Sequence, residues 1–295
     1  MAVEILIPYW GDPALMKEAV NSVLAQTSDQ WRLTIVDDAY PSLEIRDWIA
    51  ELDHPRIAYH RKPVNEGLVA NFRTPVGMAT EPLLVNLGSD DRLLPNYVEE
   101  ILRVHAQFPQ ASMIQPGVRV IDEDGNESLP LADRVKQRLV RPRGHGPQVL
   151  SGEALVANLL TGNWLYWPSI AFRTDRIQSV DFREEYAIVL DLALIVDLLA
   201  QGDVLVTTPK VCFEYRRHSA SASSLDLLDG RRFAGDRHYF AAAAAQARAL
   251  GWRRAEMAAR LRLTARAHAL TLLPEAVRTH DTRGVRTVLR HAFGA

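Results

Sequence analysis

The chain has 295 residues, a formal net charge of −2 at neutral pH, 47% hydrophobic and 24% charged residues. These are the proportions of an ordinary globular protein, long enough for one large domain plus an appendage. Its one cysteine, Cys212, excludes an internal disulfide and fits a reducing compartment. We find no apolar run near the roughly 18 residues that cross a bilayer and no leader pattern, so we expect a cytoplasmic protein.

Strand and helix patterns alternate over the first 125 or so residues. Strands are expected at residues 3–9, 31–38, 56–61, 83–87 and 112–121, and helices at 13–26, 42–52, 68–79 and 95–108. Asp12 followed by Pro13 is typical of a helix start, whereas Pro75 predicts a break or an end in the third helix. This alternation predicts an α/β fold, a mostly parallel sheet with helices on both faces.

The pattern loosens after Gly125. Residues 126–150 are rich in Pro, Gly, Arg and His, which predicts a long irregular connection. Later elements are expected as a helix at 152–160, a strand at 164–172, an apolar helix at 186–200 and a strand at 204–207. We therefore expect a sheet domain over residues 1–225, with halves 1–125 and 126–225, and a helical region over 226–295.

The helical region is strongly basic, with thirteen arginines and four acids from Arg231 onward. Its charged face is interpreted either as solvated surface or as a contact with an anionic membrane surface or a second subunit. Nucleic acid is disfavoured, because the arginines are not interleaved with stacking aromatics. The run Ala241–Ala245 suits close helix–helix contact and favours packing on the sheet domain or on another subunit.

Acidic pairs follow two of the expected strands, Asp37-Asp38 after the second and Asp90-Asp91 after a later one. Open sheets of this kind bind ligands beyond the carboxyl ends of their strands, so both pairs are expected to face one crevice. Mg²⁺ and Mn²⁺ prefer oxygen ligands, and Mg²⁺ is often held by carboxylates together with substrate phosphates. The pairs predict a metal that arrives with a diphosphate; a helix-capping turn is the alternative for Asp90-Asp91.

Seven short motifs occur in a recognisable order: IPYWGDP, SVLAQT, IVDDAYPS, NEGLVANFR, LGSDDRLLP, VLDLAL and FEYRRHSASAS. Together they resemble glycosyltransferase family 2, which has the GT-A fold, over roughly residues 3–225. The resemblance implies transfer of a sugar from a nucleotide-diphosphate donor of the UDP, dTDP or GDP type to an acceptor hydroxyl, with inversion. Residues 1–125 would bind the donor and residues 126–225 the acceptor.

The resemblance also implies roles for individual residues. Nucleotide binding is expected from Pro8, Tyr9, Asp38, Asn65, Gly67, Asn71 and Asp90. The metal, Mn²⁺ or Mg²⁺, would be held by Asp91, and His218 would reach the metal or a phosphate. Contacts with the diphosphate or the acceptor are expected from Arg216, Arg217 and Trp164.

Asp191 is the predicted general base, which takes the proton from the attacking acceptor hydroxyl. It interrupts the apolar helix expected at 186–200, where a buried carboxylate is costly without a purpose. A structural aspartate bridging to an arginine is the alternative. Two rival functions stay open: a sugar nucleotidyltransferase, disfavoured by a single glycine in the first loop, and a non-catalytic nucleotide-sugar or carbohydrate-binding protein of the same fold.

Overall fold

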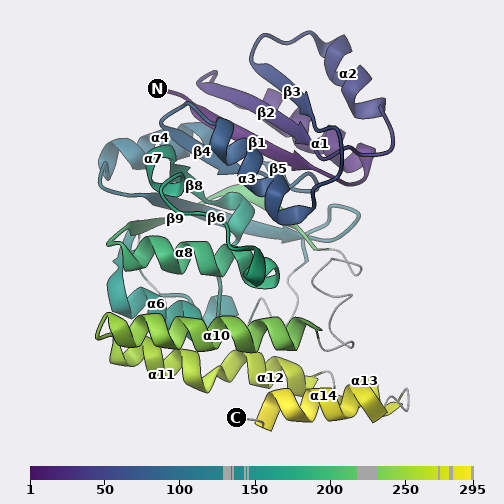
Figure 1. Cartoon of the computed structure of the whole chain (residues 1–295). Helices are drawn as coiled ribbons and strands as arrows, with labels where there is room; N and C mark the ends of the chain where they lie inside the picture. The colour runs from purple at the N-terminus through teal and green to yellow at the C-terminus, as the bar shows by residue number, and fades with distance from the viewer. Residues whose placement is uncertain are drawn as a thin grey trace.

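A mixed sheet forms the centre of the molecule (Figure 1). The computed structural model describes residues 1–128, 134, 136–142, 144, 146–217, 231–271, 273–278 and 282–293. The strands are β1 (Val3–Tyr9), β2 (Trp31–Asp37), β3 (Ile57–Arg61), β4 (Leu83–Asn86), β5 (Arg92–Leu93), β6 (Met113–Ile121), β7 (Gln148–Ser151), β8 (Ala171–Arg173) and β9 (Val204–Arg216).

The strand order is β3-β2-β1-β4-β8-β6-β9-β5, with β7 also paired to β9. Pairing is parallel from β3 through β4 and between β6 and β9, and antiparallel at β8, β5 and β7. Because β1, β2 and β3 are parallel, their carboxyl ends lie at the same edge of the sheet, as predicted. Between β4 and β5 lies the acidic loop, residues 88–91.

Helices cover both faces of this sheet. Those of the first half are α1 (Pro13–Leu24), α2 (Glu44–Leu52), α3 (Leu68–Met78) and α4 (Tyr97–Gln107). Those that follow are the π-helix η1 (Lys136–Val140), α6 (Gly152–Thr161), the 3₁₀ turn η2 (Trp167–Ser169), α7 (Thr174–Ile177), the 3₁₀ segment η3 (Glu184–Val189) and α8 (Leu190–Ala200). One buried cluster joins α1, α2 and α4 to the sheet, and a second joins α3, α6 and α8 to the other face.

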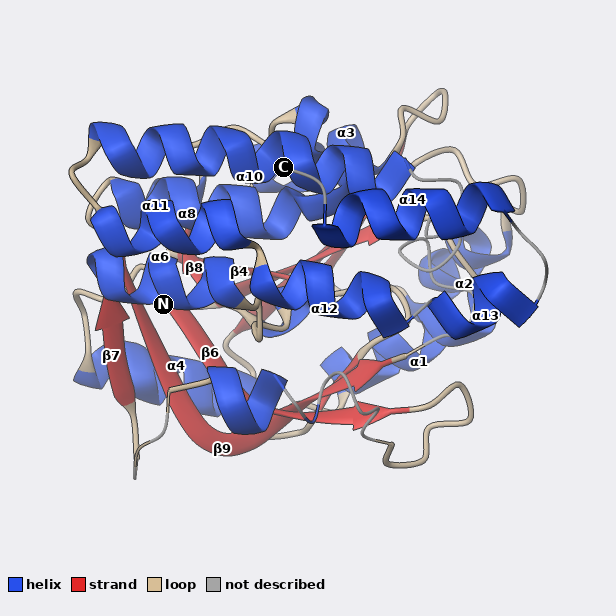
Figure 2. Cartoon of the chain, turned by 90° about the horizontal axis from the view of Figure 1, so that it is seen from below, coloured by secondary structure: helices blue, strands red, loops and turns tan. Residues whose placement is uncertain are grey.

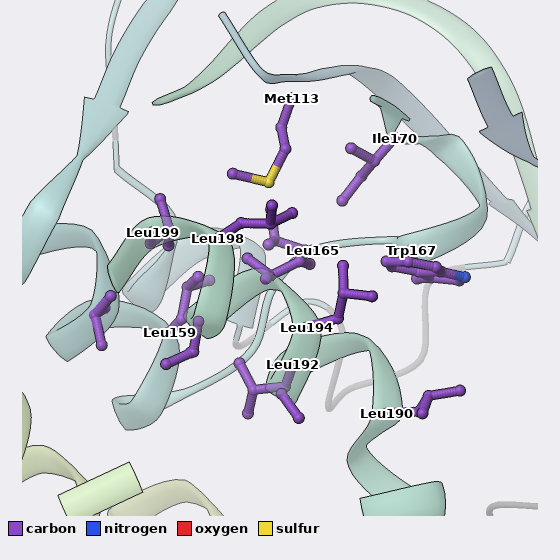
Figure 3. Close-up of a cluster of buried hydrophobic side chains, with 14 of the residues drawn as sticks. Met113, Leu159, Leu165, Trp167, Ile170, Leu190, Leu192, Leu194, Leu198 and Leu199 are labelled. Carbon is purple, nitrogen blue, oxygen red and sulfur yellow. The ribbon is translucent and has the colours of Figure 1, made fainter. Parts of the chain in front are cut away.

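Period-two alternation in the strands decides which residues enter each core. In β1, Leu6 belongs to the cluster under α3, whereas its neighbours Ile5 and Ile7 belong to the cluster under α1. Figure 3 shows the α8 side, where Leu194 and Leu198 lie with Met113 of β6 in one apolar group. The near-continuous apolar sequence of α8 follows from its position between the sheet and further helices.

The basic C-terminal region is helical, as expected. It contains α10 (Arg231–Ala249), α11 (Arg253–Leu261), α12 (Leu263–Thr271), α13 (Leu273–Arg278) and α14 (Thr282–Phe293). Figures 1 and 2 show α10 and α11 as a layer outside α6 and α8, with α12 to α14 beyond them. Ala243 and Ala244 of the alanine run are buried in the core that α8 shares, so this run packs on the sheet domain.

Two predicted boundaries are wrong in an informative way. Residues 164–172 were expected as one strand, but only Ala171–Arg173 pair, because Pro168 has no amide proton for a ladder and the chain turns through η2. Pro75 does not break the third helix, and α3 continues through it to Met78.

The last strand is much longer than the expected 204–207. The pairing of β6 with β9 shifts register around Gly117, where a Cβ atom would lie 2.7 Å from the Pro209 carbonyl oxygen. Glycine at this position therefore allows β9 to continue past Pro209. The extension pairs with β5, Glu214 opposite Arg92, and so carries the end of β9 beneath the acidic loop.

Candidate active site

The acidic loop is a tight turn in which both carboxylates lie against the backbone. The Asp91 amide donates to the Gly88 carbonyl at 3.2 Å. A Cβ atom at Gly88 would lie 2.5 Å from Asp91 Oδ2 and 2.9 Å from Asp90 Oδ1, so a side chain there would displace both acids. A Cβ atom at Gly11 would lie 3.3 Å from Ser89 Oγ, which places the turn after β1 directly beside this loop.

Arg216, the last residue of β9, holds the acidic loop. Its guanidinium donates to the carbonyls of Asp90 and Glu123, both at 2.8 Å, and pairs with Glu18 at 2.6 Å. Its backbone amide donates to Asp91 Oδ1 at 2.8 Å, and the residue is 4% exposed. The expectation that Arg216 contacts a diphosphate is not met in this arrangement, because these partners already occupy its guanidinium.

Asp91 is an electrostatically strained carboxyl group. It is 1% exposed, and burial, followed by the charge of Asp90, raises its pKa well above the usual range. The Arg216 amide and the charges of Arg216 and Arg217 oppose this shift without cancelling it. A buried carboxyl group with a second carboxylate beside it favours a cation, and oxygen ligands suit Mg²⁺ or Mn²⁺. The residues present therefore fit a divalent ion bound by Asp91, with Asp90 beside it.

The rest of such a coordination shell is not supplied by a cluster of protein ligands. Over the described residues, no group of three or more His, Cys, Asp or Glu side chains gathers as a metal site. His218 lies outside the described residues, so its contact with the metal or a phosphate stays a prediction. A site with one or two carboxylates is typical of Mg²⁺ that also binds substrate phosphates and water.

The other acidic pair, at the end of β2, stabilises local structure. Asp37 is fully buried and accepts hydrogen bonds from the Tyr59 hydroxyl and the Arg61 guanidinium. The two oxygens of Asp38 accept from consecutive backbone amides of residues 66–67, at 3.1 and 2.9 Å. Asp38 is therefore already used to fix the turn before α3, and its predicted hydrogen bond to a nucleotide base would have to replace or share these contacts.

The turn before α3 and the start of α3 carry three of the residues predicted to bind a nucleotide. Gly67 has a φ of 85°, in the region that favours glycine, and Asn65 is exposed. Asn71 instead points inward: it is buried, and among the described residues its Oδ1 atom has no hydrogen-bond partner. Asp38, which follows β2, holds this turn through the amides of residues 66–67, and nucleotide contacts from the turn stay a prediction.

Two further buried amides were not singled out from the sequence. Asn86, the last residue of β4, and Gln115 on β6 each leave a buried side-chain nitrogen without a hydrogen-bond partner in the part of the chain that the structure describes. Strand alternation places them on the α3 face, two residues after Leu84 and Met113 of that core. In the sequence, both could have been recognised as polar residues inside otherwise apolar strands. Buried unpaired amides near strand ends are candidates for binding polar groups of a ligand.

The first turn presents one exposed aromatic side chain. Tyr9 is fully buried, with its ring 5.1 Å from that of Tyr40, and Pro8 is half-buried. Trp10 is 48% exposed and stands edge-on to Tyr40 at 5.4 Å. Tyr9, one of the two residues predicted to flank a base, therefore lies below the surface and packs on Tyr40. Trp10, to which no role was assigned from the sequence, presents an exposed aromatic ring at this turn.

Asp191 was predicted to lie inside the helix expected at 186–200, but the structure places it in the first turn of α8. Helix α8 begins at Leu190, because η3 precedes it with Tyr186 at φ −116° and ψ 29°, outside the helical region. The Asn163 side-chain amide donates to Asp191 Oδ2 at 3.2 Å, and Asn163 Oδ1 accepts from the Leu165 amide at 3.1 Å. The helix N-terminus favours the carboxylate charge, and Asn163 orients it.

Tyr215 connects the two halves of the site. Burial is the main cause that raises the pKa of Tyr215; Arg217 opposes it, and the charges of Asp91, Asp90 and Asp191 raise it further. All three acids therefore lie close enough to act on one phenol. The Arg217 guanidinium lies 5.0 Å from the Tyr215 ring centroid. The predicted metal ligand, the predicted base and one predicted diphosphate contact thus all act electrostatically on the same side chain.

Trp164 does not face this site. It is 2% exposed, and its indole N–H donates to Asn158 Oδ1 at 2.6 Å. The expectation of an acceptor contact from Trp164 is not met, because its ring belongs to the core between α6 and α8.

This fold and this edge of the sheet define the class of the protein. Residues 4–156 match the family described as Glycosyl transferase family 2, and the chain belongs to that family.

Curated relatives resemble parts of the chain. A putative colanic acid biosynthesis glycosyl transferase, WcaA of Escherichia coli K12, is 30% identical over 101 residues, which are 34% of this chain and 36% of the relative's length. An uncharacterised Mycobacterium tuberculosis protein, MT1568, is 24% identical over 239 residues, 80% of this chain and 73% of its own.

Solved structures share the fold. Residues 1–349 of TarS from S. aureus superpose with a TM-score of 0.67 at 10% identity, covering 99% of this chain and 81% of that one. The same fragment in complex with UDP-GlcNAc gives a TM-score of 0.63 at 11% identity, covering 82% and 66%. At these identities the likeness concerns the fold alone.

Proposed function

We propose that this chain transfers a sugar from a nucleotide-diphosphate donor to an acceptor hydroxyl, with inversion at the anomeric carbon and with the help of Mn²⁺ or Mg²⁺. The observation that carries the proposal is the buried Asp91 beside Asp90 in the acidic loop, held by the backbone amide of Arg216, with the charges of these two acids and of Asp191 all acting on the adjacent Tyr215. A metal-ligand pair and a separate carboxylate near it are what such a transfer needs on opposite sides of the reacting carbon.

The donor diphosphate would lie at the acidic loop. Asp91 and Asp90 would hold the divalent ion, which supplies positive charge to the leaving diphosphate. The charge of Arg217 acts in the same direction, because its guanidinium lies beside Tyr215 and already acts on Asp91. Trp10 and the turn before α3 would border the nucleotide.

The acceptor would approach from the α8 side. Asp191 takes the proton from its hydroxyl as the oxygen attacks the anomeric carbon from the face opposite the diphosphate. Asn163 holds Asp191 Oδ2, which keeps the carboxylate oriented for this transfer. A single displacement of this kind inverts the configuration.

The donor is best identified with a panel of UDP-, dTDP- and GDP-sugars, since TarS, which shares the fold, was solved with UDP-GlcNAc. Each sugar nucleotide would be tested for stabilisation of the protein with and without Mn²⁺, and for slow hydrolysis. One donor should bind in a metal-dependent way, and Asp91→Asn should abolish that dependence and lower activity at least about 100-fold. Full activity in excess EDTA would contradict the metal assignment.

A non-catalytic nucleotide-sugar or carbohydrate-binding role is the second candidate. It would show the same donor binding without hydrolysis or transfer, so the panel separates the two functions. The presence of Asp191, whose charge acts on the same tyrosine as the charges of the acidic loop, favours the enzyme.

Cellular location and assembly also remain proposals. None of the described helices is long and apolar enough to span a membrane. We place the chain in the cytoplasm, with a peripheral contact at the inner membrane surface or a homodimer through the C-terminal helices as further predictions. Co-sedimentation with acidic liposomes and light scattering would test these two.

A further inference from the structure

Large apolar side chains face outward along α11, in the outer layer of the molecule. Met257 is 58% exposed and Leu261 is 45% exposed, and the two lie one helical turn apart. Leu263, at the start of α12, is 57% exposed. On the opposite side of α11, Ala255 and Ala259 are buried in the core shared with α6 and α8. The helix therefore packs inward through small residues and presents its large apolar ones to the surroundings.

These side chains border a groove of about 300 Å³ beside α6. Figure 2 shows α6 and α11 side by side at this surface. The walls of the groove include Ala157 of α6, Met257, Ala258 and Leu261 of α11, and Leu263 of α12, with Arg254 among them. Exposed apolar side chains that gather at one place, with polar residues around them, are typical of an interaction surface.

Unpaired arginines border this surface. Arg253 and Arg254 form the first turn of α11 and are exposed. Among the described residues, neither guanidinium has an ion-pair or hydrogen-bond partner. Glu153 of α6 accepts from the Arg254 backbone amide, at 2.6 Å. Because a helix N-terminus favours negative charge, the helix itself does not stabilise two arginines at this position.

The acid within α11 does not neutralise these two arginines. Glu256 pairs with Arg248 at 2.8 Å and with Arg260 at 2.7 Å. The whole region is basic, with thirteen arginines and four acids from Arg231 onward. An exposed apolar stripe with basic residues beside it is typical of helices that lie at a membrane interface.

We propose that α11 and the groove beside it dock on an anionic membrane surface. In this arrangement the exposed apolar side chains of residues 257, 261 and 263 enter the boundary between headgroups and acyl chains, and Arg253 and Arg254 meet lipid phosphates. A second copy of this chain fits the face less well. A two-fold contact through it sets the basic border of one copy against the same border of the other, and like charges repel.

The proposal names a face for the peripheral contact proposed above, and it does not depend on the transfer reaction. Helices α6 and α8 lie between the sheet and α11 (Figure 1). Vesicle binding is measured without donor or metal. Its failure therefore leaves the donor and metal assignments untouched, and a failed donor panel leaves the docking surface untouched.

The probe is vesicles of phosphatidylcholine alone or with phosphatidylglycerol, co-sedimented with the full-length protein. Binding should need the anionic lipid and should weaken as salt screens the charges. Arg253→Gln with Arg254→Gln should weaken it at least about tenfold, since each arginine near such a surface contributes about fivefold. Met257→Gln with Leu261→Gln should also weaken it at least about tenfold, because these side chains no longer bury apolar area in the lipid.

Arg32→Gln with Arg46→Gln is the charge-matched control. These arginines are exposed on β2 and α2, away from α11 (Figure 1), so this variant should bind like the wild type. Weaker binding by both α11 variants but not by the control supports the proposal. Each variant changes exposed side chains only, so its melting temperature should match that of the wild type.

Three results would overturn the proposal: no binding of the wild type to anionic vesicles, an equal loss in the control, or wild-type binding by either α11 variant. Light scattering tests the other occupant of the face. A wild-type dimer that Met257→Gln with Leu261→Gln dissociates would assign this face to a second copy and overturn membrane docking.

Discussion

Asp191 and Asp197 lie on the same helix, six positions apart, with different partners. Asp197 pairs with Arg183 at 2.8 Å and accepts from Gln246 at 2.9 Å, so it joins α8 to η3 and α10. Asp191 sits at the helix start and is held by Asn163 at 3.2 Å. Contacts rather than residue type separate a structural carboxylate from a candidate base.

Asp191→Asn should keep donor affinity and lower sugar transfer by about 10²–10⁴-fold, because the shape remains and the basicity is lost. Asp197→Asn is the control, since it should lower the melting temperature and leave transfer largely intact. Both rates would be measured with the donor that the panel identifies. Transfer by Asp191→Asn above about a tenth of the wild-type rate would assign the base to another residue.

Gly88→Ala tests the acidic loop. Its new Cβ atom would lie 2.5 Å from Asp91 Oδ2, so the carboxylates must move and metal-dependent donor binding should weaken at least about tenfold. Gly77→Ala is matched to it: it is helical, and a Cβ atom there meets nothing within 4 Å. Isothermal titration with Mn²⁺ and donor would compare them, and unchanged binding by Gly88→Ala would argue against this loop as the metal site.

At the scale of elements, the extended β9 decides where the site lies, and α4 holds it there. Glu100 of α4 is fully buried, and it accepts hydrogen bonds from Arg103 at 2.7 Å and from Thr208 of β9 at 2.7 Å. Burial alone would raise the pKa of Glu100, but these hydrogen bonds outweigh it and the pKa is lowered. The ionised carboxylate therefore stabilises the contact between helix and strand.

Glu100→Gln should reduce the free energy of unfolding at neutral pH by about 1–3 kcal/mol, the usual effect of weakening a charge-assisted buried contact. Because the folded-state pKa is lowered, the stabilisation is present above the ordinary value of 4.5 and is lost as pH falls through the folded-state pKa. The gap between wild type and variant should therefore close in acid. Melting curves from pH 3 to 7 would show this, with the exposed neighbour Glu99→Gln as control; a gap independent of pH would contradict it.

For the whole molecule, the C-terminal helices fall into two groups. Tyr239, Ala247 and Ala255 of α10 and α11 belong to the main core of α6 and α8. The outer helices contribute a separate small cluster, with Ala269 and Val288 buried in it. The region expected as an appendage is thus partly a layer of the main domain.

Removing residues 231–295 should expose the apolar surfaces of α6 and α8 and give protein that aggregates or melts without cooperativity. A chain ending at residue 262 retains α10 and α11 and should stay soluble with one cooperative transition. Expression, gel filtration and calorimetry of the two truncations would test this. A soluble, cooperatively melting chain of residues 1–230 would show that α10 is dispensable for the core.

The sequence by itself determined the parts that local rules govern. Alternating apolar periods located β1, β2 and α1, a cap at Asp12 located a helix start, and acids after apolar runs predicted a polar edge. Ordered motifs then led to the family. These features need no distant contacts, because each depends on neighbouring residues and on the burial pattern of one element.

Only the tertiary structure decided which of the polar residues are available for chemistry. Arg216 and Arg217 are adjacent in the sequence, yet their side chains have different partners. The Arg216 guanidinium donates to backbone carbonyls at the acidic loop, whereas the Arg217 guanidinium lies beside the Tyr215 ring. No local sequence feature distinguishes these two arginines. Their different positions follow from the register of β9 beneath the loop, since successive side chains of a strand point to opposite faces. Tertiary packing likewise places Trp164 in the core and buries the side-chain amide of Asn86. Long-range pairing sets burial and partners, and these decide whether a side chain supports the fold or meets a ligand.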